Sequence, residues 1–197
     1  MSLTMDEKAA LLIVDVQNDF CPGGALQVPH GDRVLGPINL AVERFVAAGL
    51  PVLASRDWHP PVTRHFKNYG GIWPVHCVQG SEGAAFHSEL RLPEGILVLS
   101  KGFNPDTDGY SAYEGVSEDG RNLRSILENL GIVHLYLAGL ATDYCILFTA
   151  REALQNGLFV TILSDAVAGV DLTPRASGLA LQELHRAGAR ISTVAEL

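Results

Sequence analysis

A thiol, a base and two acids stand at comparable places in this sequence, each at the end of an apolar run of strand length. Asp15 and Asp57 end two such runs, Lys101 ends a third, and Cys145 follows a fourth. A cysteine is a useful nucleophile as its thiolate, which a helix start and a nearby lysine both favour. An aspartate can take the thiol proton and return it to a leaving group. The set Asp15, Lys101 and Cys145 therefore predicts nucleophilic catalysis.

The stretch AGLATDYCILFTA around Cys145 supports this prediction. Thr142 or Asp143 can serve as N-cap, which leaves Cys145 in the first turn of a helix. The small residues of GLAT allow backbone amides to approach a substrate oxyanion. Alone, the stretch also fits a buried structural thiol. A redox role is disfavoured, because no C-x-x-C partner lies near Cys145. A fifth apolar run ends at Asp165, which we expect to be a surface charge or a cap.

A second cluster of polar residues lies at the start of the long segment from Trp58 to Gly95, which is rich in Gly, Pro and His. Residues two apart in an extended chain face the same side. Three imidazoles and a carboxylate suit a divalent ion, zinc first, with iron and manganese as alternatives. The pattern is not HExxH, which disfavours a zincin protease. A single histidine here would be a solvated side chain, but together four residues predict a metal site: Asp57, His59, His65 and His76.

Apolar runs of strand length alternate with stretches of helical periodicity. The predicted strands are 9–16, 51–57, 95–101, 133–139, 159–165 and 190–194. The predicted helices are 32–49, 121–131, 143–157 and 173–188. Gly131, Gly157 and Gly188 follow three of these helices, as left-handed C-terminal caps do.

This alternation predicts an α/β fold, namely a three-layer α/β/α sandwich around a mainly parallel sheet of about six strands. Near-continuous apolarity suits strands that are covered on both faces. Ligands of such sheets bind beyond the carboxyl ends of the strands, where the polar residues above are expected to converge. With no linker or repeat, residues 1–197 are expected to form a single domain.

Composition excludes several function classes. The formal charge of −8 comes from 22 acids against 14 bases with no Lys/Arg run, so a nucleic-acid partner is not expected. No apolar stretch approaches the length of a membrane span, so no membrane partner is expected. Three cysteines at unrelated spacings do not indicate a disulfide framework. Together these features predict a cytoplasmic protein.

Five stretches carry a resemblance to a known family, in the same order and over nearly the whole chain: LLIVDVQNDFCPGGAL, RDWHPPVTRHF, WPVHCVQGSEGAAFH, KGFNPDTDGYSAY and GLATDYCILFTAREALQNG. The chain resembles the nicotinamidase/pyrazinamidase branch of the isochorismatase-like cysteine hydrolases. The resemblance implies hydrolysis of nicotinamide to nicotinate and ammonia through a thioester, for NAD salvage. It implies Asp15, Lys101 and Cys145 as the triad.

The resemblance also implies further site features. The Leu140–Ala141 bond is expected to be cis, and the amides of Ala141 and Cys145 are expected to form the oxyanion hole. The metal ligands match at Asp57, His59, His65 and His76, where the ion would orient the substrate ring nitrogen. Substrate-binding positions carried over from the family are Phe20, Leu26, Trp73, Tyr110, Leu140 and Ala141.

Roles for a few remaining residues stay open at this point. Leu26 fits the core nearly as well as a pocket. Gln17 and Asn18 are expected to support the Asp15 turn, and Tyr144 leaves fine substrate preference undecided. Cys21 and Cys77 have no catalytic counterpart and are expected to be packed thiols. A homo-oligomer is compatible with the family.

Two other functions remain as alternatives. A metal-free isochorismatase-type or carbamoyl-amine hydrolase would use the same thiol chemistry, but such branches generally lack the Asp/His cluster. A catalytically silent binding protein is disfavoured by the intact triad.

Overall fold

Six strands form one sheet in the order β3-β2-β1-β4-β5-β6, and all five neighbouring pairs are parallel. The computed structural model describes residues 7–197, so the first six residues of the predicted domain 1–197 lie outside the described part. The strands are β1 (Ala9–Val14), β2 (Val52–Asp57), β3 (Leu97–Lys101), β4 (His134–Leu140), β5 (Phe159–Ala168) and β6 (Arg190–Ser192).

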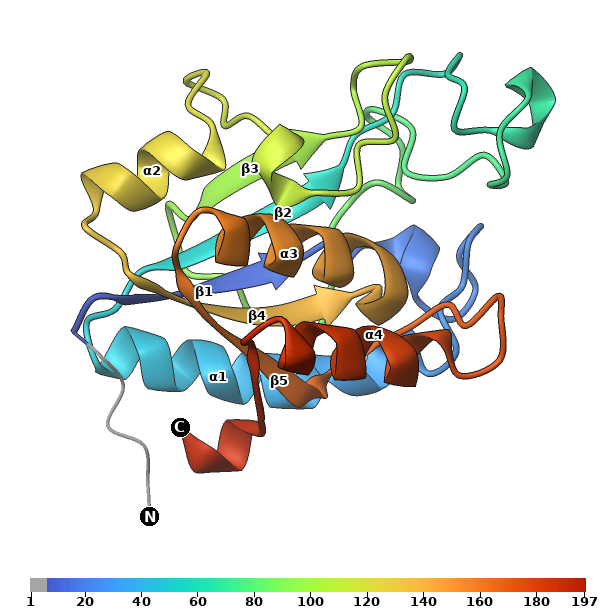
Figure 1. The fold of residues 1–197 in the computed structure, drawn as a ribbon. Coiled ribbons are helices and arrows are strands. Elements are labelled where there is room, and N and C mark those ends of the chain that lie inside the picture. Colours follow the sequence, from blue (N-terminus) through green and yellow to red (C-terminus); the bar gives the residue numbers. More distant parts are fainter. Residues whose placement is uncertain (1–6) are drawn as a thin grey trace.

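Four α-helices cover the two faces of this sheet, as Figure 1 shows. Helix α1 packs on one face, and α2, α3 and α4 pack on the other. Their bounds are α1 (Leu35–Ala47), α2 (Leu123–Asn129), α3 (Leu147–Gln155) and α4 (Ala176–Arg186). The predicted three-layer α/β/α sandwich is confirmed.

Strand β1 shows why the sequence reads as a continuous apolar run. Its six residues are all fully buried, and successive side chains enter different cores. Leu11 and Ile13 join the core under α1, where Phe45 also lies. Leu12 joins the opposite core, which contains Leu184 of α4. A strand covered on both faces has no polar side to alternate with.

The ends of most elements differ by one to three residues from the expected bounds, and two differences have a clear structural cause. Strand β5 runs to Ala168 and not to residue 165, because Val167 and Ala168 resume pairing with β4 after a register shift between Leu137 and Gly139. The helix expected from residue 143 starts at Leu147 and is preceded by a wide π-helical turn, Thr142–Ile146. The three predicted glycine caps all have positive φ, from 66° at Gly131 to 106° at Gly188.

The sheet topology brings the predicted chemical residues to one edge. The chain runs outward in opposite directions from the adjacent strands β1 and β4, and the crevice at such a switch point is the usual ligand site. Asp15 follows β1 and the Cys145 turn follows β4, while Asp57 and Lys101 are paired at the ends of β2 and β3. The segment between β2 and β3 extends beyond this same edge (Figure 1). No helix within residues 7–197 has the length and apolarity needed to cross a membrane.

Candidate active site

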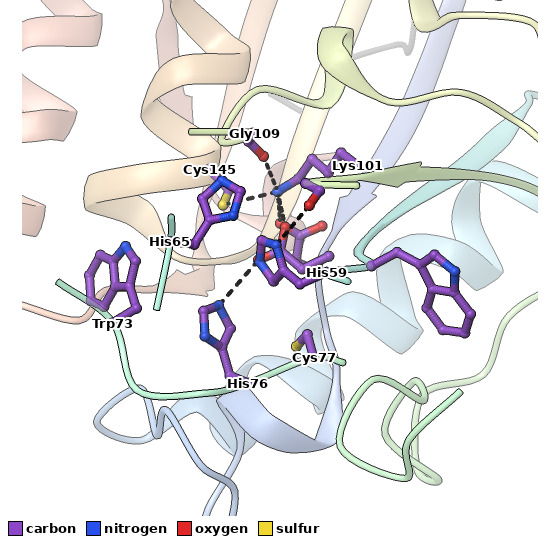
Figure 2. A network of polar contacts seen from close by, with 12 residues as sticks. His59, His65, Trp73, His76, Cys77, Lys101, Gly109 and Cys145 are labelled. Carbon is purple, nitrogen blue, oxygen red and sulfur yellow. Dashed lines mark hydrogen bonds and ion pairs between the residues drawn. The ribbon is translucent and has the colours of Figure 1, made fainter. Parts of the chain in front are cut away.

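The ammonium group of Lys101 is the centre of a buried network that joins the predicted triad. Its Nζ lies 2.8 Å from Oδ2 of Asp15, 3.3 Å from Sγ of Cys145 and 2.5 Å from Oδ1 of Asp57. It also donates to the carbonyl of Gly109 at 3.1 Å (Figure 2). Four partners satisfy a side chain with no solvent exposure at all. The structure thus brings Asp15, Lys101 and Cys145 together.

Asp15 is held in place by the neighbouring strand. Its amide donates to the carbonyl of Ser55 at 3.1 Å, and the Ser55 hydroxyl donates to Oδ1 at 2.7 Å. The backbone of Asp15 has a φ of 50°, a region that few non-glycine residues adopt. Nearby, Gly139 lets β4 pass close to β1, because a Cβ there would lie 2.0 Å from the Val14 carbonyl oxygen. The ends of β1 and β4 therefore lie close enough for one site.

Burial sets the protonation of these groups. Burial would lower the pKa of Lys101, but the carboxylates of Asp15 and Asp57 raise it well above its ordinary value. Burial raises the pKa of Asp15, although Lys101 opposes the shift. Burial also raises the pKa of Cys145 well above its ordinary value, although the nearby Lys101 lowers it. Lys101 lowers the thiol pKa as expected, but the effect of burial is larger, so Cys145 rests as a thiol and needs a base.

The turn that carries Cys145 also differs from a simple capped helix start. Ala141 precedes the turn, and no side chain caps it, so neither Thr142 nor Asp143 is the N-cap. The amides of Tyr144 and Ile146 both donate to the Ala141 carbonyl, at 3.1 Å each. The Cys145 amide between them takes no part in these two bonds. The Leu140–Ala141 peptide bond is cis, as expected from the resemblance.

The predicted metal ligands gather beside this network. Oδ2 of Asp57 lies 3.6 Å from Nε2 of His59 and 3.8 Å from Nε2 of His76. The ring of His65 lies 4.5 Å from that of His59, centroid to centroid. Donor atoms of Asp57, His59 and His76 all lie within 4.8 Å of one another, a group that does not include His65. Nevertheless, Nε2 of His65 is buried and makes no hydrogen bond of ordinary length.

The protonation of this cluster suits a cation. Burial would raise the pKa of Asp57, but Lys101 and His59 hold it below its ordinary value. Burial lowers the pKa of His76 to about 4, and it also lowers the pKa of His65, with His59 adding to the shift. A carboxylate beside neutral imidazoles is the donor set of a borderline divalent ion. Nε2 of His65, which makes no hydrogen bond of ordinary length, is a further ligand atom available to a cation, so these residues fit a metal ion.

The backbone amide of Gln17 donates to the Asp15 carbonyl at 2.9 Å, as expected of a residue that supports the Asp15 turn, while the Gln17 side chain holds the backbone of Asp57. Its Nε2 donates to the carbonyls of Asp57 and Ala84, each at 2.8 Å, and its Oε1 accepts from the Asp57 amide at 2.8 Å. Asn18 instead donates to the Glu82 carbonyl at 2.8 Å. Both side chains thus anchor the segment that follows the metal cluster.

One pocket is lined by the nucleophile, the metal cluster and the predicted ring-binding residues together. Trp73 donates from Nε1 to the hydroxyl of Tyr110 at 2.9 Å, and Tyr144 packs against both rings. Leu140 is not among the lining residues, and its side chain lies in the hydrophobic core, 1% exposed. The lining residues are Phe20, Leu26, Asp57, His59, His65, Trp73, His76, Asp108, Tyr110, Ala141, Tyr144, Cys145 and Val170.

Several residues at the site were missed from the sequence. Val170 follows the end of β5 and Asp108 lies in the loop after β3, so the rule that ligands bind beyond strand ends could have found both. Asp143 accepts from the amides of Val170 and Asp171 at 2.9 and 2.8 Å. No sequence signal indicates that contact or the one between Ser55 and Asp15. Of the other thiols, Cys21 and Cys77 are free and buried, as expected.

Comparison with known proteins agrees with this geometry. A family model described as the isochorismatase domain matches residues 9–196. Nicotinamidase from Escherichia coli (strain K12) is 39% identical over 206 aligned positions, covering 95% of each chain.

Two solved structures are similar over their full length. Pyrazinamidase of Pyrococcus horikoshii in complex with zinc has 40% identity and a TM-score of 0.87, covering 94% of this chain and 99% of its own. PnC1 from L. infantum in complex with nicotinate has 35% identity and a TM-score of 0.87, covering 100% of this chain and 98% of its own. The family match spans all the residues that form the site. The two structural matches cover 94% and 100% of the chain. The chain belongs to the isochorismatase family of hydrolases, in the branch of the nicotinamidases and pyrazinamidases.

Proposed function

We propose that this chain hydrolyses nicotinamide, and pyrazinamide as well, to the carboxylate and ammonia. The observation that carries the proposal is that Cys145 and the Asp57 metal cluster line one pocket. A thiol alone fits any member of the family. A metal cluster facing the same pocket suits a substrate with both a carboxamide and a separate donor atom. The aromatic walls Trp73 and Tyr110 suit a flat ring between the two.

The first half of the reaction forms a thioester. Sγ of Cys145 attacks the carboxamide carbon while its proton passes to Asp15, whose raised pKa suits a carboxyl that accepts and returns a proton. The amide oxygen becomes an oxyanion, which the amides of Ala141 and Cys145 stabilise. Asp15 then gives the proton to the nitrogen, the C–N bond breaks, and ammonia leaves.

The second half hydrolyses the thioester. Asp15 takes a proton from water, and the hydroxide forms a bond to the acyl carbon. The C–S bond then breaks and the proton on Asp15 passes to the Cys145 sulfur. The acid product leaves and gives its own proton to solvent, which makes it the carboxylate. Lys101 keeps its positive charge throughout, held by Asp15 and Asp57, and stabilises the sulfur anion that forms and leaves. In each half of the reaction, Asp15 therefore carries the proton and Lys101 supplies a constant positive charge.

A divalent metal ion, zinc first among the candidates, is proposed at Asp57, His59, His65 and His76. When bound, it supplies a Lewis-acidic site for a lone pair on the substrate ring nitrogen. The histidines and Asp57 hold the ring end, while Phe20 and Leu26 complete the apolar wall. One similar solved structure is in complex with zinc and another is in complex with nicotinate, which supports a metal ion and a pyridine carboxylate as ligands of this site.

We also propose that residues 1–197 form one domain that works in the cytoplasm in salvage of nicotinamide for NAD. Its three cysteines are free, in keeping with a reducing compartment. Because the proposed substrate is a small molecule, we expect neither a nucleic acid nor a membrane as a partner. A homo-oligomer is compatible with the family.

The test is ammonia release from nicotinamide and pyrazinamide by zinc-loaded protein. Benzamide serves as matched substrate, because it has the same ring size and carboxamide but no ring nitrogen. We expect turnover of the first two amides and a much higher KM for benzamide. Cys145→Ala should abolish turnover in a folded protein, and His59→Ala should lower metal content and weaken substrate binding. Turnover of isochorismate or a carbamoyl amine, with none of nicotinamide, would refute the proposal.

A further inference from the structure

The three histidines of the metal cluster are oriented by different kinds of partner. Nδ1 of His59 lies 2.9 Å from the Gly102 carbonyl, and Nδ1 of His76 lies 2.8 Å from the Pro74 carbonyl. A carbonyl can only accept, so in both rings Nδ1 carries the proton and Nε2 offers its lone pair. The backbone thus fixes the metal-binding form of these two rings.

His65 has a side-chain partner instead. Its Nδ1 lies 2.5 Å from Oγ1 of Thr63. A hydroxyl can donate or accept, so this contact permits either tautomer of the ring. If the hydroxyl donates, Nε2 carries the proton and cannot bind a cation. If the hydroxyl accepts, the Nε2 lone pair is free for one.

The surroundings of Thr63 leave it little choice of other partners. Its side chain is buried, with the whole residue 1% exposed. Besides the ring of His65, its hydroxyl oxygen contacts the His65 backbone amide at 3.4 Å. On the far side of the ring, the buried Nε2 has no hydrogen bond of ordinary length, and His65 lines the pocket. A bound cation would satisfy this nitrogen only in the tautomer that donates to Thr63.

We infer that Thr63 is a positioning residue for the metal site: its hydroxyl accepts the Nδ1 proton of His65 and so directs the Nε2 lone pair toward the ion. This inference rests on the metal site of the proposed function. Partners that orient a ligating histidine typically change metal affinity by about 10- to 100-fold when they are removed. His65 is the only one of the three rings whose partner a substitution can delete, because the other two bond to backbone.

The chain offers a matched set of variants. Thr63→Val removes the hydroxyl at nearly constant volume, and Thr63→Ser keeps it. Thr161→Val is the control, since Oγ1 of Thr161 lies 2.8 Å from Nε2 of His134 and is likewise buried, but between β5 and β4 and away from the pocket. We expect zinc affinity to fall about 10- to 100-fold in Thr63→Val, to recover in Thr63→Ser, and to stay unchanged in Thr161→Val.

The following measurements separate an effect of Thr63 on the orientation of His65 from a general loss of structure. Zinc affinity is measured by competition with a chromophoric chelator, beside the melting temperature of each apo protein. The visible spectrum of the cobalt-loaded protein reports the ligand set, and we expect Thr63→Val to shift it toward that of His65→Ala. If Thr63 acts through His65, Thr63→Val will cause no further loss of affinity in a His65→Ala background.

Three results would overturn the inference: wild-type zinc affinity in Thr63→Val, wild-type affinity in His65→Ala, or losses from the two substitutions that simply add. Failure of the proposed function looks different. A wild-type protein that binds zinc but does not hydrolyse nicotinamide refutes the activity, while the affinity series still decides the role of Thr63.

Discussion

The carboxylate of Asp57 and the ammonium group of Lys101 join the two halves of the site. Oδ1 of Asp57 lies 2.5 Å from Nζ of Lys101, while Oδ2 of the same carboxylate lies 3.6 Å from Nε2 of His59. The metal cluster and the thiol network therefore share one buried carboxylate. Because Lys101 also pairs with Asp15, it is the positive charge between two buried acids.

Lys101→Met should remove activity and stability together. Without the ammonium group, two buried carboxylates lose the positive charge they share, which costs about 3–5 kcal/mol in the free energy of unfolding. Loss of one member of a catalytic set that acts as a unit should lower kcat/KM by about 10³-fold or more. Ammonia release and urea unfolding measure the two effects. Lys67→Met, at an exposed position, is the control and should change neither. Near wild-type turnover in Lys101→Met would contradict the triad.

Alkaline pH should destabilise the fold through Cys21. Burial, with Asp32 adding, raises the pKa of Cys21 from an ordinary 9.0 to about 11. Between these values the folded chain keeps a proton that the unfolded chain loses, so stability falls as pH rises from about 9 to about 11. Urea unfolding across this range measures the slope, which should be shallower in Cys21→Ala. An identical slope in the variant would show that Cys21 does not contribute.

Asp143→Asn should change substrate binding more than turnover. The carboxylate holds the amides of Val170 and Asp171, and Val170 is a pocket wall. An amide in its place keeps one acceptor and turns a donor toward the other N–H. Stability should fall by about 1–3 kcal/mol, and a displaced apolar wall should raise KM about tenfold.

Asp165→Asn, in β5, is the matched control for Asp143→Asn. Asp165 also accepts a backbone amide, that of Val194 at 2.9 and 3.1 Å, but does not line the pocket. It should lower the melting temperature and leave KM unchanged. If both variants lose stability and neither changes KM, Asp143 has no role in the pocket.

Tyr110→Phe should loosen the ring-binding wall. It removes the acceptor for Nε1 of Trp73, while the packing of both rings on Tyr144 remains. We expect KM to rise by about 3- to 10-fold, which is the worth of one ordinary hydrogen bond, with kcat nearly constant. Tyr113→Phe is the comparison, because the buried Tyr113 hydroxyl makes no hydrogen bond of ordinary length. Equal effects from both substitutions would contradict a specific role for the Trp73–Tyr110 bond.

The fold was accessible from the sequence because its signals are local. Continuous apolar runs and helical spacing predicted the six strands and the four α-helices found within residues 7–197. Ends were less accurate: β5 is longer than expected, because its last residues pair with β4 after a register shift that depends on another strand. The helix after β4 starts late because the amides of Tyr144 and Ile146 both donate to the Ala141 carbonyl, which makes the first turn π-helical.

The candidate site divides in the same way. Strand ends of a parallel sheet lie at one edge, so Asp15, Lys101 and Cys145 were predictable neighbours. The contact of the Gln17 side chain with Asp57 was not predicted, because it spans 40 positions of the chain. The raised pKa of Cys145 was not predicted, since burial comes from side chains of many elements at once.

The sequence by itself determined which side chains reach this edge, because hydrophobic periodicity and turn residues act over a few positions. Only the tertiary structure decided which atoms meet there. One Asp57 oxygen faces Lys101 and the other faces His59, and Thr63, rather than a carbonyl, holds His65. Such choices depend on rotamers and on segments brought together by folding, and a linear pattern carries no record of either.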